Sequence, residues 1–454
     1  MTPKADTIAA IATATGNAAL GIVRISGPDA GDVLSRVVTR ANATQFPRQM
    51  RFGFARDVTS GEVIDEVLCF FIPAPLTATG EDVAEIHGHG GTLVLNQLLH
   101  QVLMAGARLA HPGEFTRRAY TNGKMDLTQA EAVMSLIGAR SERAARMAAR
   151  QLGGAIGESL ATEYEQVTRI SAMLEVCLDF PDEDLPAEQT FEFVEKLGNV
   201  ANKLTRAVQS YRVGQLLTRG AKVVIAGPSN AGKSSLLNAL LHEDRALVDS
   251  VPGTTRDVVE ASFEINGIPI TFFDTAGIRY GAENVERMGM EKSRKALSQA
   301  DLILFVVDGS MPESIDAEIT LLMETYAENL LPVLNKCDSG DFNAAAFPDS
   351  FQNAVHISAT QHLHLDGLQS RMADLLVDAG QVADLILTTS RQLTAVETAL
   401  EHVVTARTLL GDGDAPELAA ADMRWAREAL ASLWGRDSQT EMIDAIFSSF
   451  CLGK

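Results

Sequence analysis

The stretch Gly227-Pro-Ser-Asn-Ala-Gly-Lys-Ser234 decides the fold of the central part of this chain. It fits the eight-residue phosphate-loop pattern at every fixed position. The apolar run Ala221–Ala226 before it predicts a buried strand, and Ser235–Leu241 after it predicts a helix. Backbone N–H groups of such a loop and the following helix N-terminus bind phosphate groups. We expect Lys233 to reach the β- and γ-phosphates and Ser234 to hold Mg²⁺.

Three later motifs indicate that the nucleotide is GTP. Asp274-Thr-Ala-Gly277 ends the apolar strand Ile270–Phe273 and offers a carboxylate for Mg²⁺ and an N–H for the γ-phosphate. Asn335-Lys-Cys-Asp338 follows the apolar strand Leu331–Leu334, and its final carboxylate can accept hydrogen bonds from the N1–H and 2-amino groups of guanine. Adenine offers neither donor. Ser358-Ala359 suits backbone contact with the guanine O6.

Composition favours an intracellular enzyme of several domains. The chain has 454 residues, 46% of them hydrophobic, a length typical of about three domains. A net charge of −21 excludes a general nucleic-acid binder, so any RNA contact needs a local basic patch or a partner. The four cysteines are widely spaced, which favours a reducing compartment, and we expect a cytoplasmic protein. No apolar run reaches the roughly 18 residues of a membrane span.

The order of patterns predicts a multidomain α/β and α fold. Residues 1–120 alternate strand-like runs with turns and predict an α+β domain. Residues 121–215 have helical periodicity, and residues 216–378 alternate strands and helices as in a P-loop GTPase domain with a mostly parallel sheet. Residues 379–454 are helical again. The simplest architecture inserts the GTPase domain into a helical domain built from both flanks.

Local patterns give further expectations. Gly21–Ile25 and Val67–Ile72 predict strands of the first domain. Thr128 and Glu131 have the spacing of a capping box at the start of the first helical segment. Gly411–Pro416 predicts a loop between helices. One apolar stripe at helical spacing follows that loop: Met423, Ala426, Leu430, Leu433 and Trp434.

The GTPase pattern lacks a usual catalytic residue. Many small GTPases orient the attacking water with a Gln directly after the Asp-x-x-Gly motif, and Ile278 stands there in this chain. The following polar run Arg279–Arg287 offers charged replacements, and each of them can equally be a solvated loop charge. They are Arg279, Glu283, Glu286 and Arg287.

Two more features of the nucleotide region carry alternatives. Asn230 lies inside the phosphate loop, where its carbonyl oxygen can ligate a cation, although Asn also favours turn geometry. Gly253-Thr-Thr-Arg-Asp257 reads as a switch segment, and Thr255 is the natural second hydroxyl ligand for Mg²⁺.

Longer runs carry a family resemblance. They are Thr79–Gly91, Pro112–Leu127, Gly253–Asp257, Asp274–Gly277 and the terminal Phe447-Ser-Ser-Phe-Cys-Leu-Gly-Lys454. Over nearly its whole length the chain resembles the MnmE (TrmE) family of tRNA-modifying GTPases. The terminal Cys-x-Gly-Lys and the N-terminal runs are far more specific than a phosphate loop, which many families share.

The resemblance implies a homodimer that acts with the flavoprotein MnmG (GidA), which carries FAD, in a heterotetramer or larger complex. The pair installs an aminomethyl or carboxymethylaminomethyl group at C5 of the wobble uridine of certain tRNAs. It uses GTP hydrolysis and a tetrahydrofolate one-carbon unit in the 5,10-methylene or 5-formyl form. The alternative is a regulatory or ribosome-assembly GTPase switch without modification chemistry, and folate binding would discriminate between the two.

The resemblance also implies ligand sites. The N-terminal domain would bind folate and form the dimer, with folate contacts from Arg24, Glu85, Lys124 and Lys454. A K⁺ site beside the phosphates would supply positive charge where other GTPases use an arginine finger. Its ligands would be Asn230, carbonyls at Asp249 and Val251, and Thr254.

The implied catalytic residues are Lys233, Glu286 as the water-orienting acid, and Cys451. Cys451 has three interpretations: a poor prenylation box, a buried structural thiol, or a nucleophile whose pKa the neighbouring Lys454 lowers. The implied GTP-binding residues are Gly227, Asn230, Ala231, Gly232, Lys233, Ser234, Ser235, Asp249, Ser250, Val251, Pro252, Gly253, Thr254, Thr255, Asp274, Thr275, Ala276, Gly277, Asn335, Lys336, Asp338, Ser358 and Ala359.

Two clusters outside these motifs have a functional and a plain interpretation. His87 and His89 suggest a metal pair, but the sequence supplies no third ligand cluster. Arg143, Arg146 and Arg150 share a helical face that can meet tRNA phosphate, and such a face is more often simply solvated.

Overall fold

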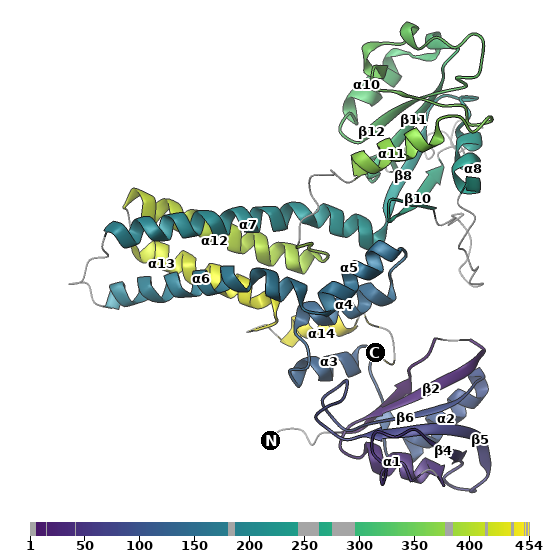
Figure 1. Ribbon diagram of the computed structural model, residues 1–454, viewed down its shortest axis with the longest axis vertical. Coiled ribbons are helices and arrows are strands. Elements are labelled where there is room, and N and C mark those ends of the chain that lie inside the picture. The colour runs from purple at the N-terminus through teal and green to yellow at the C-terminus, as the bar shows by residue number, and fades with distance from the viewer. Residues whose placement is uncertain are drawn as a thin grey trace, which may run out of the picture. The chain divides into compact units, whose positions relative to one another are not determined.

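The computed structural model divides into two compact units (Figure 1). One comprises Met1–Met134, Gln151–Gly157 and Glu428–Lys454, and the other Ser135–Arg150 and Glu158–Arg427. The structure describes residues 6–14, 16–40, 42–179, 187–243, 263–274, 296–376, 385–413, 416–436, 440–448, 450 and 453.

The first unit is built on a seven-stranded sheet with the strand order β3-β4-β5-β6-β2-β1-β7. All neighbours are antiparallel except β1 and β7. The strands are β1 (Ile8–Ile11), β2 (Ala18–Ser26), β3 (Val38–Thr39), β4 (Arg51–Arg56), β5 (Val63–Ile72), β6 (Val83–Gly90) and β7 (Arg108–Leu109). The two strands predicted in this part of the chain are therefore confirmed.

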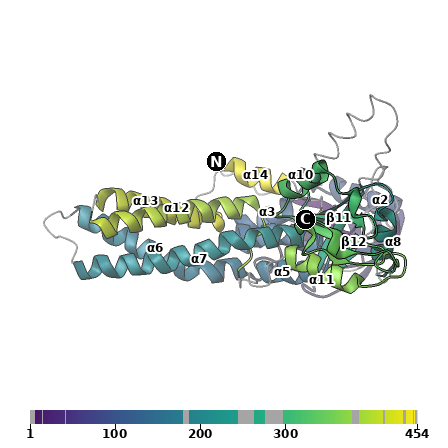
Figure 2. The same cartoon turned by 90° about the horizontal axis from the view of Figure 1, so that it is seen from above.

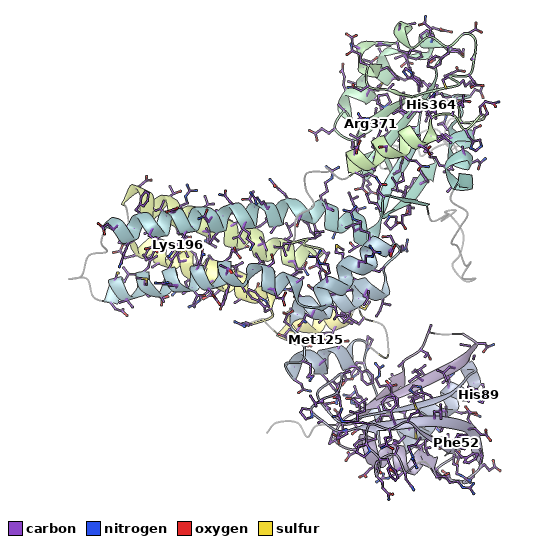
Figure 3. The ribbon with its side chains drawn as sticks, viewed as in Figure 1. Phe52, His89, Met125, Lys196, His364 and Arg371 are labelled. Atoms are coloured by element: carbon purple, nitrogen blue, oxygen red, sulfur yellow. The ribbon has the colours of Figure 1, made fainter. Side chains whose placement is uncertain are left out.

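The two faces of this sheet differ because side chains alternate along each strand. Helices α1 (Ala30–Val37) and α2 (Thr92–Met104) pack with one face, where Ile25 and Ile86 are completely buried. The other face carries more exposed side chains, among them Phe52, which is 54% exposed. Figure 3 labels Phe52 and His89 on this sheet. An apolar face that its own helices leave open is available to a ligand or a partner.

Three helices complete the first unit: α3 (Glu114–Thr121), α4 (Leu127–Ile137, up to Met134) and α14 (Thr440–Ser448). A small apolar cluster joins α4 to the C-terminal segment through Leu127, Ala130, Phe447 and Phe450. The Tyr120 hydroxyl donates a hydrogen bond of 2.7 Å to the carbonyl of Gly435. The end of the chain is thus part of the N-terminal unit.

The capping box predicted from Thr128 and Glu131 is wrong by two residues. The Asp126 carboxylate accepts a hydrogen bond from the Gln129 N–H at 2.9 Å, and the Gln129 side chain accepts one from the Asp126 N–H at 2.9 Å. This reciprocal pair caps the helix two residues earlier than the sequence pattern suggested. Thr128 lies inside the first turn, and its hydroxyl donates to Asp126.

The second unit contains a six-stranded sheet with the order β13-β12-β11-β8-β10-β9, parallel except for β9. Its strands are β8 (Ala221–Ala226), β9 (Phe263–Ile265), β10 (Ile268–Asp274), β11 (Leu302–Asp308), β12 (Leu330–Asn335) and β13 (Val355–His356). Its helices are α8 (Lys233–Glu243), α10 (Ala317–Thr325) and α11 (Leu365–Leu376), with 3-10 turns at Pro312–Ser314, Ala344–Ala346 and Asp349–Phe351. The predicted mostly parallel sheet is confirmed.

The helical part of the second unit is formed by long helices that run side by side in both views (Figures 1 and 2). They are α6 (Ala155–Asp179), α7 (Ala187–Arg219), α12 (Ser390–Asp412) and α13 (Pro416–Leu433, up to Arg427 in this unit), and the shorter α5 (Glu142–Leu152) precedes them in the chain. Four residues of the predicted apolar stripe on α13 are fully buried: Met423, Ala426, Leu430 and Leu433. No helix within the described ranges has both the length and the apolar character needed to cross a membrane.

The second sheet is inserted between helices α7 and α12, and the end of α7 lies next to the start of α12. Gln215 near the end of α7 donates a hydrogen bond of 2.7 Å to the carbonyl of Thr388, just before α12. A side chain at Gly214 would lie 1.9 Å from the Leu387 carbonyl oxygen, so the two backbones need glycine there. This arrangement suits an inserted P-loop domain. The domain boundaries at 120, 215 and 378 stay predictions.

Candidate functional site

The phosphate loop joins the end of β8 to the start of α8, as its sequence predicted. Gly227, Asn230 and Gly232 have φ values of 137°, 63° and 94°, a region that favours glycine and tolerates asparagine. A Cβ atom on Gly227 would lie 2.0 Å from the Val306 carbonyl oxygen. The glycines are therefore required by both the turn and the close approach of neighbouring backbone.

Asn335 ties three of the nucleotide motifs together. Its side-chain amide donates to the Ala231 carbonyl in the phosphate loop at 2.8 Å, and its side-chain oxygen accepts from the Ala359 N–H at 3.0 Å. Its own carbonyl accepts from the Gly309 N–H at 2.9 Å. Because Asn335 is only 3% exposed, these hydrogen bonds are shielded from water and hold the loops in register.

The residues predicted to bind guanine lie in the loops that follow β12 and β13. Asp338 is exposed in the loop after β12, and Ser358 is completely buried beside Ala359. Lys336 has φ 64°, and its ammonium group pairs with the Asp308 carboxylate at 2.6 Å. The geometry leaves the Asp338 carboxylate available to accept hydrogen bonds from a ligand.

Asp308 was missed by sequence reasoning. Burial opposes its charged form, but hydrogen bonds from Lys336 and Ser310 lower its pKa below the usual value. The signal was present in the sequence, because the all-apolar run Leu302–Val307 ends at this acid, as other strands of the sheet end at motif residues. Through this ion pair, Asp308 at the end of β11 fixes the Lys336 side chain in the loop after β12.

The side chains predicted to bind phosphate and Mg²⁺ lie at the first turn of α8. The Lys233 ammonium donates to the carbonyls of Gly227 and Pro228 at 2.9 and 2.7 Å, which folds it over the loop. Ser234 and Ser235 are exposed at the helix N-terminus. Backbone N–H groups at such a terminus, with an ammonium and a hydroxyl, suit a magnesium-bound phosphate.

Several predicted site residues lie outside the described part of the chain. They are Asp249, Ser250, Val251, Pro252, Gly253, Thr254, Thr255, Thr275, Ala276, Gly277, Glu286, Cys451 and Lys454, together with the alternatives Arg279, Glu283 and Arg287. Asp274 is the last residue of β10, and its backbone lies beside Ile225 of β8. These roles stay predictions.

Two of the predicted folate residues meet on the first sheet. Arg24 on β2 and Glu85 on β6 are cross-strand neighbours, and the Arg24 Nε donates to Glu85 Oε1 at 2.7 Å. Lys124 lies after α3, where its ammonium donates to the Pro75 carbonyl at 3.2 Å. Lys124 is therefore bound to the loop before β6. Among the hydrogen bonds of the described residues, none joins it to Arg24 or Glu85.

His87 and His89 are held by different acids. His87 Nε2 lies 2.9 Å from Glu85 Oε2, and His89 Nδ1 lies 2.6 Å from Asp65 Oδ1. The Asp65 hydrogen bond raises the pKa of His89. Among the described residues, no three His, Cys, Asp or Glu side chains gather as metal ligands.

The predicted arginine face of α5 is divided in its contacts. The Arg143 guanidinium donates to the carbonyl of Asn266 in the β9–β10 turn at 3.2 Å, and Ser141 donates to the carbonyl of Gly267 at 2.7 Å. Arg146 pairs with Glu142 one turn before it. Arg143 thus anchors a hairpin of the second sheet.

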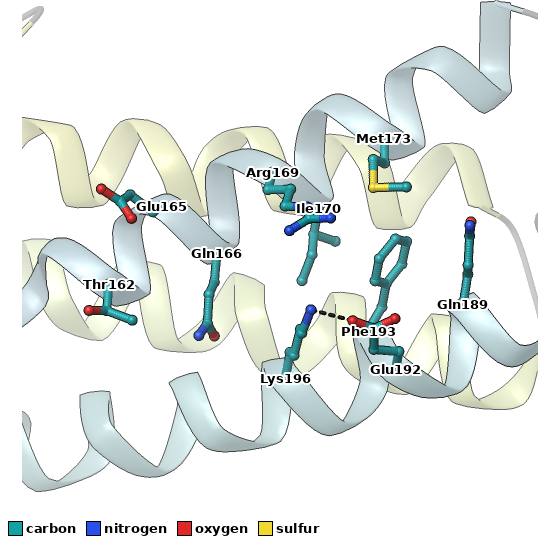
Figure 4. A pocket seen from close by; sticks show the side chains of 10 residues that line it. All are labelled: Thr162, Glu165, Gln166, Arg169, Ile170, Met173, Gln189, Glu192, Phe193 and Lys196. Atoms are coloured by element: carbon teal, nitrogen blue, oxygen red, sulfur yellow. Dashed lines mark hydrogen bonds and ion pairs between the residues drawn. The ribbon is translucent and has the colours of Figure 1, made fainter.

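Two hollows lie away from the motifs. One, of about 330 Å³, lies between α6 and α7 and is lined by Arg169, Phe193 and Lys196 among others (Figure 4). The Lys196 ammonium pairs with Glu192 one turn earlier on α7. The other, of about 510 Å³, lies beside α3 and α14 in the first unit. Its charged groups are largely paired with one another, as Glu114 is with Arg118.

Comparison with known proteins matches both parts of the chain. A family model described as the GTP-binding protein TrmE N-terminus matches residues 7–124, and one described as the MnmE helical domain matches residues 127–451. The tRNA modification GTPase MnmE of Carboxydothermus hydrogenoformans is 37% identical over 99% of both chains. The proteins of the same description from Streptococcus mutans and Akkermansia muciniphila are each 38% identical over 100% of both chains.

Proposed function

The chain belongs to the MnmE (TrmE) family of tRNA modification GTPases, and from this premise we propose which chemistry it serves. It hydrolyses GTP and, with a flavoprotein partner of the MnmG type that carries FAD, adds an aminomethyl or carboxymethylaminomethyl group at C5 of the wobble uridine. The one-carbon unit comes from a tetrahydrofolate derivative. The relatives' description favours this proposal over a regulatory or ribosome-assembly switch.

The observation that carries the proposal is that one chain holds two separate clusters of polar groups, each suited to a ligand. The second sheet has a phosphate loop tied by Asn335 to the guanine-binding segments. The first sheet has an Arg24–Glu85 pair, with side chains 25% and 11% exposed, on the face that α1 and α2 leave open. A GTPase that acts only as a switch needs the first arrangement and has no use for the second.

The nucleotide site fits the proposed cations in part. Ser234 at the start of α8 offers a hydroxyl to Mg²⁺, with Thr255 as the proposed second ligand. The exposed Asn230, in its left-handed conformation, offers a carbonyl oxygen to K⁺. The other proposed K⁺ ligands are Asp249, Val251 and Thr254. A monovalent cation there supplies charge for hydrolysis.

The first sheet fits a folate. A pterin ring is flat, has apolar faces, and carries adjacent N–H and amino donors that a carboxylate accepts. Glu85 supplies such a carboxylate, and the partly exposed Phe70 beside it on β5 supplies apolar surface. The buried Phe115 ring, whose centroid lies 5.9 Å from the Arg24 guanidinium, supports Arg24 from below. We propose Arg24, Glu85, Lys124 and Lys454 as folate contacts.

The remaining parts of the proposal concern assembly. The protein acts in the cytoplasm as a homodimer through its N-terminal domain, and the dimer joins the flavoprotein in a heterotetramer or larger complex. Because the chain carries a net charge of −21, the partner supplies most contacts to tRNA phosphate. Glu286, Lys233 and Cys451 are the proposed catalytic residues.

One experiment tests the proposal as a whole. Mass analysis of tRNA from a deletion strain measures the wobble-uridine modification, after complementation with the wild-type gene, Lys233→Ala or Glu85→Gln. We expect the wild type alone to restore the modification. Full restoration by Glu85→Gln would contradict the folate part. If the deletion strain and its parent had the same level of wobble-uridine modification, the whole proposal would be contradicted.

The cation part has its own test. Exchange of K⁺ for Na⁺ at equal ionic strength should slow GTP hydrolysis by about tenfold or more, because the proposed cation stabilises charge in the transition state. Equal rates in the two salts would contradict the K⁺ site.

A further inference from the structure

His87 is fixed on the open face of the first sheet by two partners. It stands two residues after Glu85 on β6, so both side chains project from the same face. Its Nε2 lies 2.9 Å from Glu85 Oε2, and its ring packs edge-on against Phe70 with 5.6 Å between centroids. Only 14% of the His87 side chain is exposed, so this geometry is held by packing.

The contact with His87 completes the anchoring of Glu85. Arg24 donates to one carboxylate oxygen at 2.7 Å, and His87 lies beside the other. Burial alone would raise the pKa of Glu85, but the hydrogen bonds from His87 and Arg24 outweigh it and lower that pKa. Glu85 is therefore a carboxylate, and because a carboxylate only accepts, His87 donates from Nε2.

A carboxylate held at both oxygens has a fixed plane. Each oxygen keeps a further lone pair, so the pair of oxygens can still accept two parallel hydrogen bonds from a ligand. Without His87, rotation about the last side-chain bond of Glu85 would be limited by Arg24 alone. A ligand whose two donors are fixed in a ring plane binds best to a carboxylate that is already oriented.

We propose that His87 is a positioning residue for folate binding, which orients the Glu85 carboxylate through its Nε2 hydrogen bond. The proposal rests on the proposed folate function of this face. It assigns His87 a role through Glu85 and not a contact with the folate. The opposing interpretation is that His87 only stabilises the sheet through its packing on Phe70.

The test compares two variants of similar size in the full-length protein. His87→Gln keeps an N–H donor that can reach Glu85, and His87→Leu keeps the packing volume without a donor. The affinity for 5-formyltetrahydrofolate is measured by calorimetry. We expect His87→Leu to bind about tenfold more weakly and His87→Gln to stay within about threefold of the wild type, since hydrogen bonds to charged groups have this magnitude.

A matched control and a fold check accompany these variants. The control is His89→Leu. His89 lies two residues further along β6, where its side chain pairs with Asp65, so this substitution should leave folate affinity unchanged. Thermal unfolding and GTP binding report on the fold of each variant. If His87→Leu does not fold, His87→Phe replaces it, because it preserves a ring against Phe70 and also lacks the donor.

A double-mutant cycle separates positioning from packing. If His87 acts through Glu85, then His87→Leu should cost less than about twofold in affinity when Glu85→Gln is already present. An equal loss in both backgrounds, or wild-type affinity of His87→Leu, would overturn the role of His87 while leaving the folate site intact. No binding by the wild type would overturn the folate function itself.

Discussion

The nucleotide site and the Arg24–Glu85–His87 cluster are held together by different kinds of groups. At the nucleotide site, the glycine loop presents main-chain groups, and Asn335 fixes them through two main-chain partners. On the first sheet, three side chains from two strands hold one another, and the sheet supplies only their spacing. The first site should fail when its backbone is disturbed, and the second when one side chain loses a hydrogen bond.

Gly232→Ala should have the largest effect. A Cβ atom there would lie 2.1 Å from the Asn335 amide nitrogen, and φ is 94°. Backbone strain together with loss of the Asn335 hydrogen bonds should cost about 4 kcal/mol, or roughly 10³-fold in GTP affinity. Calorimetry with GTP and with 5-formyltetrahydrofolate measures both sites.

The matched control is Gly340→Ala, where an added Cβ meets nothing within 4 Å. It should bind both ligands like the wild type. If Gly232→Ala bound GTP normally, or lost folate affinity to the same degree, the distinction between a backbone-built and a side-chain-built site would be wrong.

Glu286→Ala should have the next largest effect, and on rate alone. As the proposed water-orienting acid it should slow single-turnover hydrolysis by about 10²-fold, while GTP affinity stays unchanged because the loop and guanine contacts remain. Rapid-quench measurement at saturating GTP checks this. An unchanged rate would show that another group orients the water. Glu283→Ala, on the same segment, is the control.

The difference between the sites also explains what the sequence could predict. A phosphate loop is one contiguous pattern flanked by its strand and helix, so Ala221–Ala226 was predicted to the residue as β8. Asn335 and Ala359 could be placed at the site because one ends β12 and the other lies just beyond β13, at the carboxyl ends of parallel strands. By contrast, 61 residues separate Arg24 from Glu85, and only the sheet register brings them together. Family resemblance named both residues as folate contacts, but their hydrogen bond to each other was not predicted.

Other features were beyond sequence reasoning for similar reasons. His87 looked like half of a metal pair, because sequence spacing cannot show that Glu85 and Asp65 take the two histidines separately. The capping box was misplaced because Asp126 and Thr128 both suit a helix start, and only the hydrogen bonds identify the cap. Side-chain partners that depend on tertiary contacts leave no local signal.

Glu114→Gln tests whether the first unit depends on ion pairs more generally. Burial would raise the pKa of Glu114, but hydrogen bonds from Arg108, the His111 N–H and Arg118 lower it to about 2. The substitution should reduce the free energy of unfolding by about 2 kcal/mol at neutral pH, since it removes charged hydrogen bonds. Denaturant unfolding of the full chain, followed by a probe in the first unit, measures this.

The pH dependence of this effect has a definite sign. A carboxylate with a lowered pKa contributes stability that is fully present above its ordinary pKa of 4.5 and is lost as pH falls toward about 2. The difference between the wild type and Glu114→Gln should therefore shrink as pH falls from about 5 to about 2. A difference that stayed constant over this window would show that Glu114 acts by packing.

Asp308→Asn should have the smallest effect, because it touches the nucleotide site through a side chain and not through the backbone. The Asp308–Lys336 pair is 2.6 Å long, but Lys336 is 42% exposed, so solvent screens the interaction. The substitution preserves shape and a hydrogen-bond acceptor for Ser310. We expect GTP and GDP affinities to fall together by about fivefold, near 1 kcal/mol, since Lys336 belongs to the motif predicted to bind guanine and not the phosphates. Asp349→Asn, on an exposed 3-10 turn of the same unit, is the control and should not change either affinity.

A loss confined to GTP would mean that Asp308 senses the γ-phosphate. A loss as large as that of Gly232→Ala would mean that side chains hold this site as much as the backbone does.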